Sequence, residues 1–368
     1  NGGDVTADCN LTIEGGNFAG GINTVKNDSF GVLTINGGNF SNTAQYVIMN
    51  WNKAEITAGT FRTLDTASAV LFTSAYGGDA NTIGKLSISG GEFKHASDTQ
   101  EMIVDHYDET NKGNAVVTGG KFDADISKYI PTDYVQSADG TVEKLGETNA
   151  VAKVGGTYYK TLADAVAAAQ DGDTITLLKD AELTSTLNLA KNITIDGQGK
   201  YTIKAANSFT VGSDNKTYCV LYVSGEVTLK DVTVNGNEKC RVIFCDKGKL
   251  TIDGATITNG KAPNFIGGVY MTSSASFEMK SGSITGNKNA KEYQNDEYLQ
   301  YSSDLWIGAN ANGALTAING GTIGNVFVNA NAWSASNPGS FTMNGGTVTN
   351  LYVEHDANYG ATFKYNDG

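Results

Sequence analysis

The chain has 368 residues with 45 Gly and 3 Pro, 26 basic residues and a formal net charge of −13. A chain of this length is too long to fold around one compact core of ordinary depth, so we expect two units or one elongated repeat array. The Gly and Pro counts exclude collagen-like and proline-rich chains. The acidic charge without a concentrated basic segment excludes nucleic acid and anionic membranes as partners, and no apolar run is long enough to insert into a bilayer.

One repeat dominates the first half of the chain. Alternating apolar residues, a Gly pair or its equivalent, and a Phe recur in residues 11–18, 33–40, 54–61, 86–93 and 115–122. In the second of these, Leu33 and Ile35 are expected to point inward, and Phe40 to return to the core after the Gly pair. Units stacked in parallel at roughly 4.8 Å gain both ladder hydrogen bonds and burial. The pattern predicts an all-β fold, a right-handed parallel β-helix, and its uneven spacing fits a solenoid with insertions at its corners.

The repeat stops between the two halves. Residues 133–136 and 141–145 have strand-like patterns around a Ser-Ala-Asp-Gly turn, which predicts a hairpin that closes the first module. Gly146-Glu-Thr-Asn149 then reads as a short linker. We therefore predict two tandem modules, residues 1–146 with a C-terminal hairpin cap and residues 149–368 with an N-terminal helix cap.

That cap is the single convincing helix in the sequence, residues 161–170. Leu162 and Val166 share one face with two alanines, Thr161 is placed to cap the first turn, and an Asp-Gly-Asp173 turn ends the helix. A strand at 174–178 follows, and further repeat units begin near residues 193, 227, 250, 277, 315 and 341.

The order of small helix, Asp-Gly-Asp turn, short strand and stacked coils resembles the start of pectin-lyase-like β-helix proteins, in which such a helix plugs the core. The Gly-Gly-x-Phe coils that end in Phe122-Asp-Ala-Asp-Ile-Ser-Lys-Tyr-Ile-Pro131 look like repeat-rich surface proteins of Gram-positive gut bacteria. The resemblance implies a bacterial, secreted or cell-surface protein. The chain lacks an initiator Met and ends inside a repeat, so we expect it to be a piece of a larger one. The same superfold carries lyases, hydrolases and adhesins, so it does not determine activity.

Catalytic residues of this superfamily are not recognisable. A lyase of this type would need an arginine near Asp-bound calcium, but Arg62 follows a core Phe at a corner and Arg241 is expected to face water. The hydrolase segments Asn-Thr-Asp, Asp-Asp and Gly-His-Gly are absent. Carboxylates on stacked coils could still converge as acid and base, and comparable outward or turn positions are held by Asp196, Asp231 and Asp253. Asp before Gly is most often a turn former.

Metal and cofactor sites are not predicted. His106 and His355 stand among carboxylates, but neither cluster has the spacing of a strong metal motif, and ordinary surface turns explain both. The four cysteines are expected to be free, with Cys219, Cys240 and Cys245 in strand-like runs; a disulfide of Cys219 with either of the others is the alternative. We expect no catalytic residue, no metal and no cofactor.

Aromatic residues amid polar neighbours carry the remaining signal. Exposed rings flanked by Asn and Asp suit sugar stacking, whereas the alternative is that the rings cover loops against the solenoid wall. The candidate ligand-binding residues are Trp51, Tyr293, Tyr298, Tyr301, Trp306 and Trp333. We expect a monomeric, non-catalytic surface module, adhesin-like or glycan-contacting, with a glycan or a host or bacterial surface protein as partner. The alternative is a polysaccharide-active lyase or glycoside hydrolase with an unrecognised carboxylate site.

Overall fold

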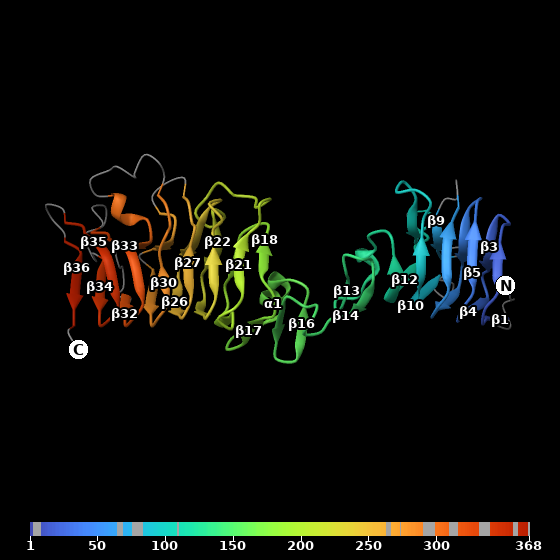
Figure 1. Cartoon of the computed structure of the whole chain (residues 1–368), viewed down its shortest axis with the longest axis horizontal. Helices are drawn as coiled ribbons and strands as arrows, with labels where there is room; N and C mark the ends of the chain where they lie inside the picture. The colour runs from blue at the N-terminus through green and yellow to red at the C-terminus, as the bar shows by residue number, and fades with distance from the viewer. Residues whose placement is uncertain are drawn as a thin grey trace. The chain divides into compact units, whose positions relative to one another are not determined.

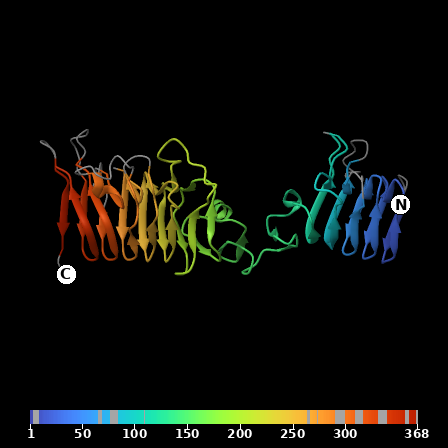
Figure 2. The same ribbon diagram turned by 45° about the horizontal axis from the view of Figure 1, so that its top comes forward.

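The fold was analysed in a computed structural model, which describes residues 1–2, 9–64, 69–75, 84–108, 110–262, 266–272, 274–289, 299–308, 316–330, 339–355 and 360–366. The chain divides into two compact units, Asn1–Asn149 and Ala150–Gly368. In each unit, strands from successive coils stack in long parallel sheets, and one short helix belongs to the second unit (Figures 1 and 2). The predicted fold class, an all-β parallel solenoid with one capping helix, is confirmed.

The first unit winds around two parallel sheets. The eight-stranded sheet contains β1 (Cys9–Ile13), β4 (Gly31–Ile35), β7 (Lys53–Ile56), β10 (Lys85–Lys94), β12 (Asn114–Phe122), β2 (Asn17–Ala19), β5 (Asn39–Asn42) and β8 (Thr60–Thr63). The four-stranded sheet contains β3 (Asn23–Asn27), β6 (Tyr46–Asn50), β9 (Ala69–Thr73) and β11 (Glu101–Val104). Each strand of the repeat pairs with its counterpart one coil on, so residues at equal repeat positions form columns.

The Phe of each repeat forms a continuous stack inside the first unit. Rings of successive coils lie 4.5–4.9 Å apart between centroids with planes within 8° of each other, in the order Phe18, Phe40, Phe61, Phe93 and Phe122. The second Gly of the pair has to be glycine because its φ is positive; at Gly91 φ is 106°, and an added Cβ would lie 3.1 Å from the Phe93 ring. The repeat Gly-Gly-x-Phe thus specifies a corner followed by a core aromatic, as predicted.

The far end of this core is covered by residues after the last repeat. η2 (Ser127–Tyr129) places the Tyr129 hydroxyl 2.8 Å from the carbonyl oxygen of Ile103, to which it donates. β13 (Tyr134–Gln136) and β14 (Val142–Lys144) then pair as the predicted antiparallel hairpin, and Val142 joins the core of the first unit.

Limited proteolysis tests whether the two units are independent. Glu147 is exposed in the segment between β14 and the second unit, so a glutamate-specific protease is expected to cut there first. Two fragments that retain β-type circular dichroism would support separate folding. A chain that resists cleavage at Glu147, or loses its structure once cut, would contradict it.

The second unit has a ten-stranded and a twelve-stranded sheet. The first contains β15 (Ala152–Val154), β16 (Thr157–Tyr159), β17 (Thr174–Leu177), β20 (Ile193–Asp196), β23 (Glu226–Lys230), β26 (Gly248–Asp253), β29 (Ala275–Met279), β32 (Thr316–Ile318), β34 (Ser340–Met343) and β36 (Thr362–Tyr365). The second contains β18 (Ala181–Leu183), β19 (Leu187–Leu189), β21 (Thr202–Ala205), β22 (Cys219–Val223), β24 (Thr233–Asn235), β25 (Arg241–Cys245), β27 (Thr256–Thr258), β28 (Val269–Met271), β30 (Ser283–Ile284), β31 (Leu305–Ile307), β33 (Thr322–Val328) and β35 (Thr347–Val353). The 3-10 helix η4 (Leu299–Ser302) precedes β31.

Helix α1 (Leu162–Ala168) is shorter than the predicted 161–170, but Thr161 caps its first turn as predicted. The Thr161 hydroxyl accepts a hydrogen bond of 3.0 Å from the backbone N–H of Asp164, which satisfies one free donor of the first turn. Leu162 and Val166 are buried in the core of the second unit. The hairpin β15–β16, which pairs antiparallel with β17, was not predicted.

The cysteines are free thiols, as expected. Cys219, Cys240 and Cys245 are buried, whereas Cys9 is exposed. Burial raises the pKa of each of the three buried thiols to about 12, so they are protonated at neutral pH and unsuited to nucleophilic chemistry.

Candidate functional site

Trp306 lies in an aromatic column on the twelve-stranded sheet of the second unit. The strand register aligns Trp306 with one aromatic residue from each neighbouring coil. The column runs through six coils in the order Tyr222, Phe244, Tyr270, Trp306, Phe327 and Tyr352. The Trp306 ring stacks on Phe327 with centroids 4.4 Å apart and planes 4° apart, and it meets Tyr270 edge to face at 6.1 Å. One face of this indole is therefore already used within the column.

The insertion before Trp306 is described only in part. Tyr301 stacks on Tyr352 at 6.2 Å, so it packs against the end of the same column. Tyr293, Tyr298 and Trp333 lie outside the described residues. For the residues seen, this arrangement matches rings that cover the solenoid wall more closely than an open stacking surface.

The expectation that Arg241 faces water is wrong. Its side chain is 0% exposed, and its guanidinium carbon lies 4.9 Å from the ring centroid of Tyr270 and 5.6 Å from that of Phe244. Nε donates to the carbonyl oxygen of Ile266 at 3.1 Å, and Nη1 donates to the Asn215 side-chain oxygen at 3.1 Å. Burial lowers the pKa of the guanidinium, but an arginine remains charged at neutral pH. This buried cation packs over the aromatic column and has no access to a substrate.

Trp51 lies beside an open groove on the four-stranded sheet of the first unit. This Trp51 groove encloses about 580 Å3 and is lined by Ile22, Asn23, Lys26, Asp28, Met49 and Trp51. The Trp51 ring contacts Phe72 at 5.1 Å and Tyr107 at 5.8 Å, both at a steep interplanar angle. Ile22 is 68% exposed and Tyr107 is 69% exposed, so both present apolar surface to solvent.

Polar groups border the apolar part of this groove. Lys26 donates a 2.8 Å hydrogen bond to the Asp28 carboxylate and thereby lowers the pKa of that carboxyl. The Asn23 side-chain amide lies 3.3 Å from the Met49 sulfur. Small-ligand sites usually combine an apolar surface with a few fixed polar groups at its border, and this groove has both.

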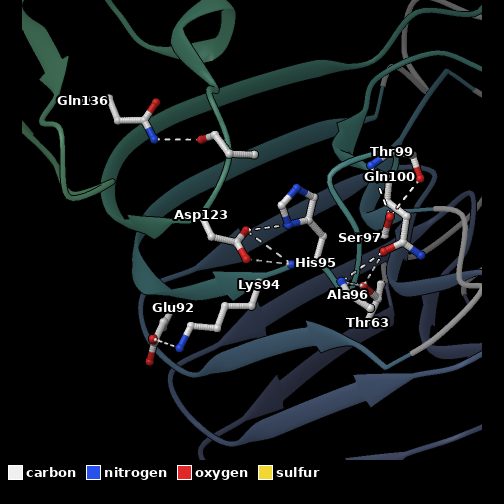
Figure 3. A network of polar contacts seen from close by, with 11 residues as sticks. Thr63, Glu92, Lys94, His95, Ala96, Ser97, Thr99, Gln100, Asp123 and Gln136 are labelled. Atoms are coloured by element: carbon white, nitrogen blue, oxygen red, sulfur yellow. Dashed lines mark hydrogen bonds and ion pairs between the residues drawn. The ribbon is translucent and has the colours of Figure 1, made fainter.

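A polar network near the corner after β10 was missed in the sequence. His95 is mostly buried, and its Nδ1 lies 3.0 Å from a carboxylate oxygen of Asp123 (Figure 3). The Asp123 carboxylate accepts hydrogen bonds from the His95 backbone N–H at 3.2 and 3.3 Å. Glu92 and Lys94 of the same strand form an ion pair with an N–O distance of 2.7 Å (Figure 3). The repeat pattern could have predicted this contact. Phe93 aligns with Phe122 in neighbouring coils, so the residues that follow them lie side by side. The histidines singled out in the sequence differ: His106 pairs with the adjacent Asp105 at 3.3 Å on the surface.

The outward carboxylates of the second unit form ion pairs with lysines. Asp196 lies 2.9 Å from Lys230, and Asp253 lies 3.4 Å from Lys280. Asp231 is exposed at a turn with φ of 45°. Burial raises the pKa of Asp304, but that carboxyl is enclosed and hydrogen-bonded to Asn287 and Asn325. Asp196 and Asp253 therefore pair with lysines of the next coil, and Asp304 is enclosed among hydrogen-bond donors.

The described residues contain no group of three or more His, Cys, Asp and Glu side chains placed to hold a metal ion. Within the same part of the chain, no helix has the length and apolar character needed to cross a membrane. Comparisons with protein-family models, curated proteins and solved structures found no match to this chain.

Proposed function

We propose that this chain is a non-catalytic surface module of a bacterial secreted or cell-surface protein, which contacts neutral or weakly charged glycans through the Trp51 groove. The observation that carries the proposal is the combination of the Trp51 ring with exposed Ile22 and Tyr107 beside fixed polar groups. Rings of this kind stack on the C–H faces of sugars, and stacking does not depend on the net charge of −13.

The residues that line the groove support a recognition role rather than catalysis. A glycoside hydrolase needs an accessible carboxylic acid and a second carboxylate across the bond that breaks. Among the described residues that line the groove, the one carboxyl is that of Asp28, whose pKa is lowered by Lys26. The order α1, turn, β17 and stacked coils supports membership of the pectin-lyase-like superfamily, which we propose as the origin of the second unit. An adhesin-like module of this kind acts as a monomer toward a glycan or a surface protein.

A glycan array followed by titration of variants tests the proposal. Trp51→Ala is expected to weaken the binding of the best neutral glycan by at least about tenfold, because the stacking surface is lost. Trp306→Phe is the matched control, since it removes an indole but keeps a ring in the column, and it is expected to bind like the parent. Binding that survives Trp51→Ala but fails in Trp306→Phe would move the site to the second unit. No binding to any neutral glycan would overturn the proposal.

A further inference from the structure

A second groove lies on the eight-stranded sheet of the first unit. β2, β5, β8 and the end of β10 pair in parallel, and their residues form three columns. The buried Phe stack is the middle column. The outward columns beside it are Asn17, Asn39, Thr60 and Glu92 on one side, and Ala19, Ser41, Arg62 and Lys94 on the other.

This Arg62 groove, lined by residues of those columns, encloses about 410 Å3. That volume lies within the range of roughly 300–1,000 Å3 that is usual for small-ligand sites. Its shape follows from side-chain size. Ala19 and Ser41 are small and leave room above the sheet, and the long Arg62 and Lys94 side chains close one end of this space.

The Asn column is fixed by its own hydrogen bonds. The Asn39 side-chain amide donates to the Asn17 oxygen at 2.8 Å, and the Thr60 hydroxyl donates to the Asn39 oxygen at 2.5 Å. These contacts orient the exposed amides, which retain donors and acceptors for a ligand. Preorganised amides in a row suit the hydroxyl groups of a sugar, because little side-chain entropy is lost on binding.

The charges of the opposite column differ in their availability. Lys94 is held by Glu92 at 2.7 Å, whereas Arg62 is exposed and forms no ion pair with any carboxylate in the described part of the chain. A guanidinium presents a planar fork that fits a carboxylate with two parallel hydrogen bonds. Arg62 is therefore the cation in this groove that is available for an anionic group.

We propose that the Arg62 groove binds a carboxylate-bearing oligosaccharide, with Arg62 holding the carboxylate and the Asn17–Asn39–Thr60 column holding sugar hydroxyls. The net charge of −13 disfavours anions near the chain as a whole, so the attraction of Arg62 for a carboxylate is local, modest in strength and weakened by salt. This site lies on a different sheet from Trp51, so either proposal can fail without the other.

Sialyllactose and lactose are the matched probes, because they differ by one carboxylate-bearing sugar. Titration of the full chain by calorimetry or ligand-observed NMR is expected to show binding of sialyllactose at least about tenfold tighter than lactose. Arg62→Gln is expected to remove that preference. Lys85→Gln, which loses the same charge at an exposed position on the same sheet, is expected to keep it.

Several outcomes would overturn the proposal. Equal binding of the two sugars, wild-type preference in Arg62→Gln, or equal losses in Arg62→Gln and Lys85→Gln would each exclude a specific role for Arg62. No binding of sialyllactose, or selective binding of an acidic peptide in its place, would exclude the carboxylated sugar. Because the test for the Trp51 groove uses neutral glycans and Trp51→Ala, failure of one test leaves the result of the other intact.

Discussion

Leu162→Asp is expected to lower the free energy of unfolding of the second unit by about 3–5 kcal/mol. Leu162 is 1% exposed and packs with Ala152, Ile175 and other residues of the core cluster under α1. The substitution removes a buried apolar side chain and places a carboxylate among the apolar side chains of that cluster. A carboxylate without a partner is costly in such surroundings, and either it stays ionised at that cost or the helix leaves the core.

The measurement can be confined to the second unit. The chain has three tryptophans, so a Trp51→Phe background leaves only Trp306 and Trp333, both in the second unit, as fluorescent reporters of urea unfolding. Ala163→Asp is the matched control, because it puts the same charge in the same helical turn at an exposed position. Its effect is expected to stay within about 0.5 kcal/mol. Equal unfolding midpoints for Leu162→Asp and Ala163→Asp would show that α1 does not plug this core.

The fold could be predicted because its determinants are local and repeated. Leu33, Ile35 and Phe40 recur at equal positions in each coil, and the period of two decides which of them face the core. The hairpin β15–β16 was missed, although Val154-Gly-Gly-Thr157 places a two-residue turn between strand-like runs. Short strands flanking a Gly pair look like one more corner in a sequence full of Gly pairs.

The candidate site was harder to predict because it depends on neighbours from different coils. Arg241 was assigned to solvent since arginines on strands usually face water, but Tyr222, Phe244 and Tyr270 make this outer surface aromatic. Aligning these positions from coil to coil would have indicated that aromatic rings lie next to Arg241 and can shield its guanidinium from water. Similarly, His95 meets Asp123 only after the repeats are stacked, at a sequence distance of 28 residues. The identity of a ligand stays a prediction, since a column of side chains determines shape and charge but not which molecule is encountered.

Asp304→Ala is expected to destabilise the second unit by about 3 kcal/mol or more, because it leaves buried donors without an acceptor. Asp304 is 3% exposed. One carboxylate oxygen accepts from the Asn287 backbone N–H at 3.1 Å and from its side-chain amide at 2.8 Å, and the other accepts from the Asn325 backbone N–H at 2.9 Å. The carboxylate therefore joins segments that are far apart in the sequence. Asp253→Ala, which removes a partly exposed carboxylate paired with Lys280, is the control and is expected to cost at most about 1 kcal/mol.

The pH dependence of stability gives an independent test of the same carboxyl. Burial raises the pKa of Asp304 in the folded chain above its value of about 3.9 in an unfolded chain, so the folded state binds the proton more tightly. The stabilisation due to this difference is fully present below about pH 3.9 and is lost as the pH rises through the folded-state pKa. Asp304→Asn is neutral at every pH and retains one acceptor oxygen, so it is expected to lack this fall while being less destabilised than Asp304→Ala.

Urea unfolding across that pH window, in the Trp51→Phe background, measures both effects. If Asp304→Asn shows the same pH slope as the parent, the carboxyl of Asp304 is not the group that titrates. If Asp304→Ala is no less stable than Asp253→Ala, the buried hydrogen bonds to Asn287 and Asn325 do not hold the coils together.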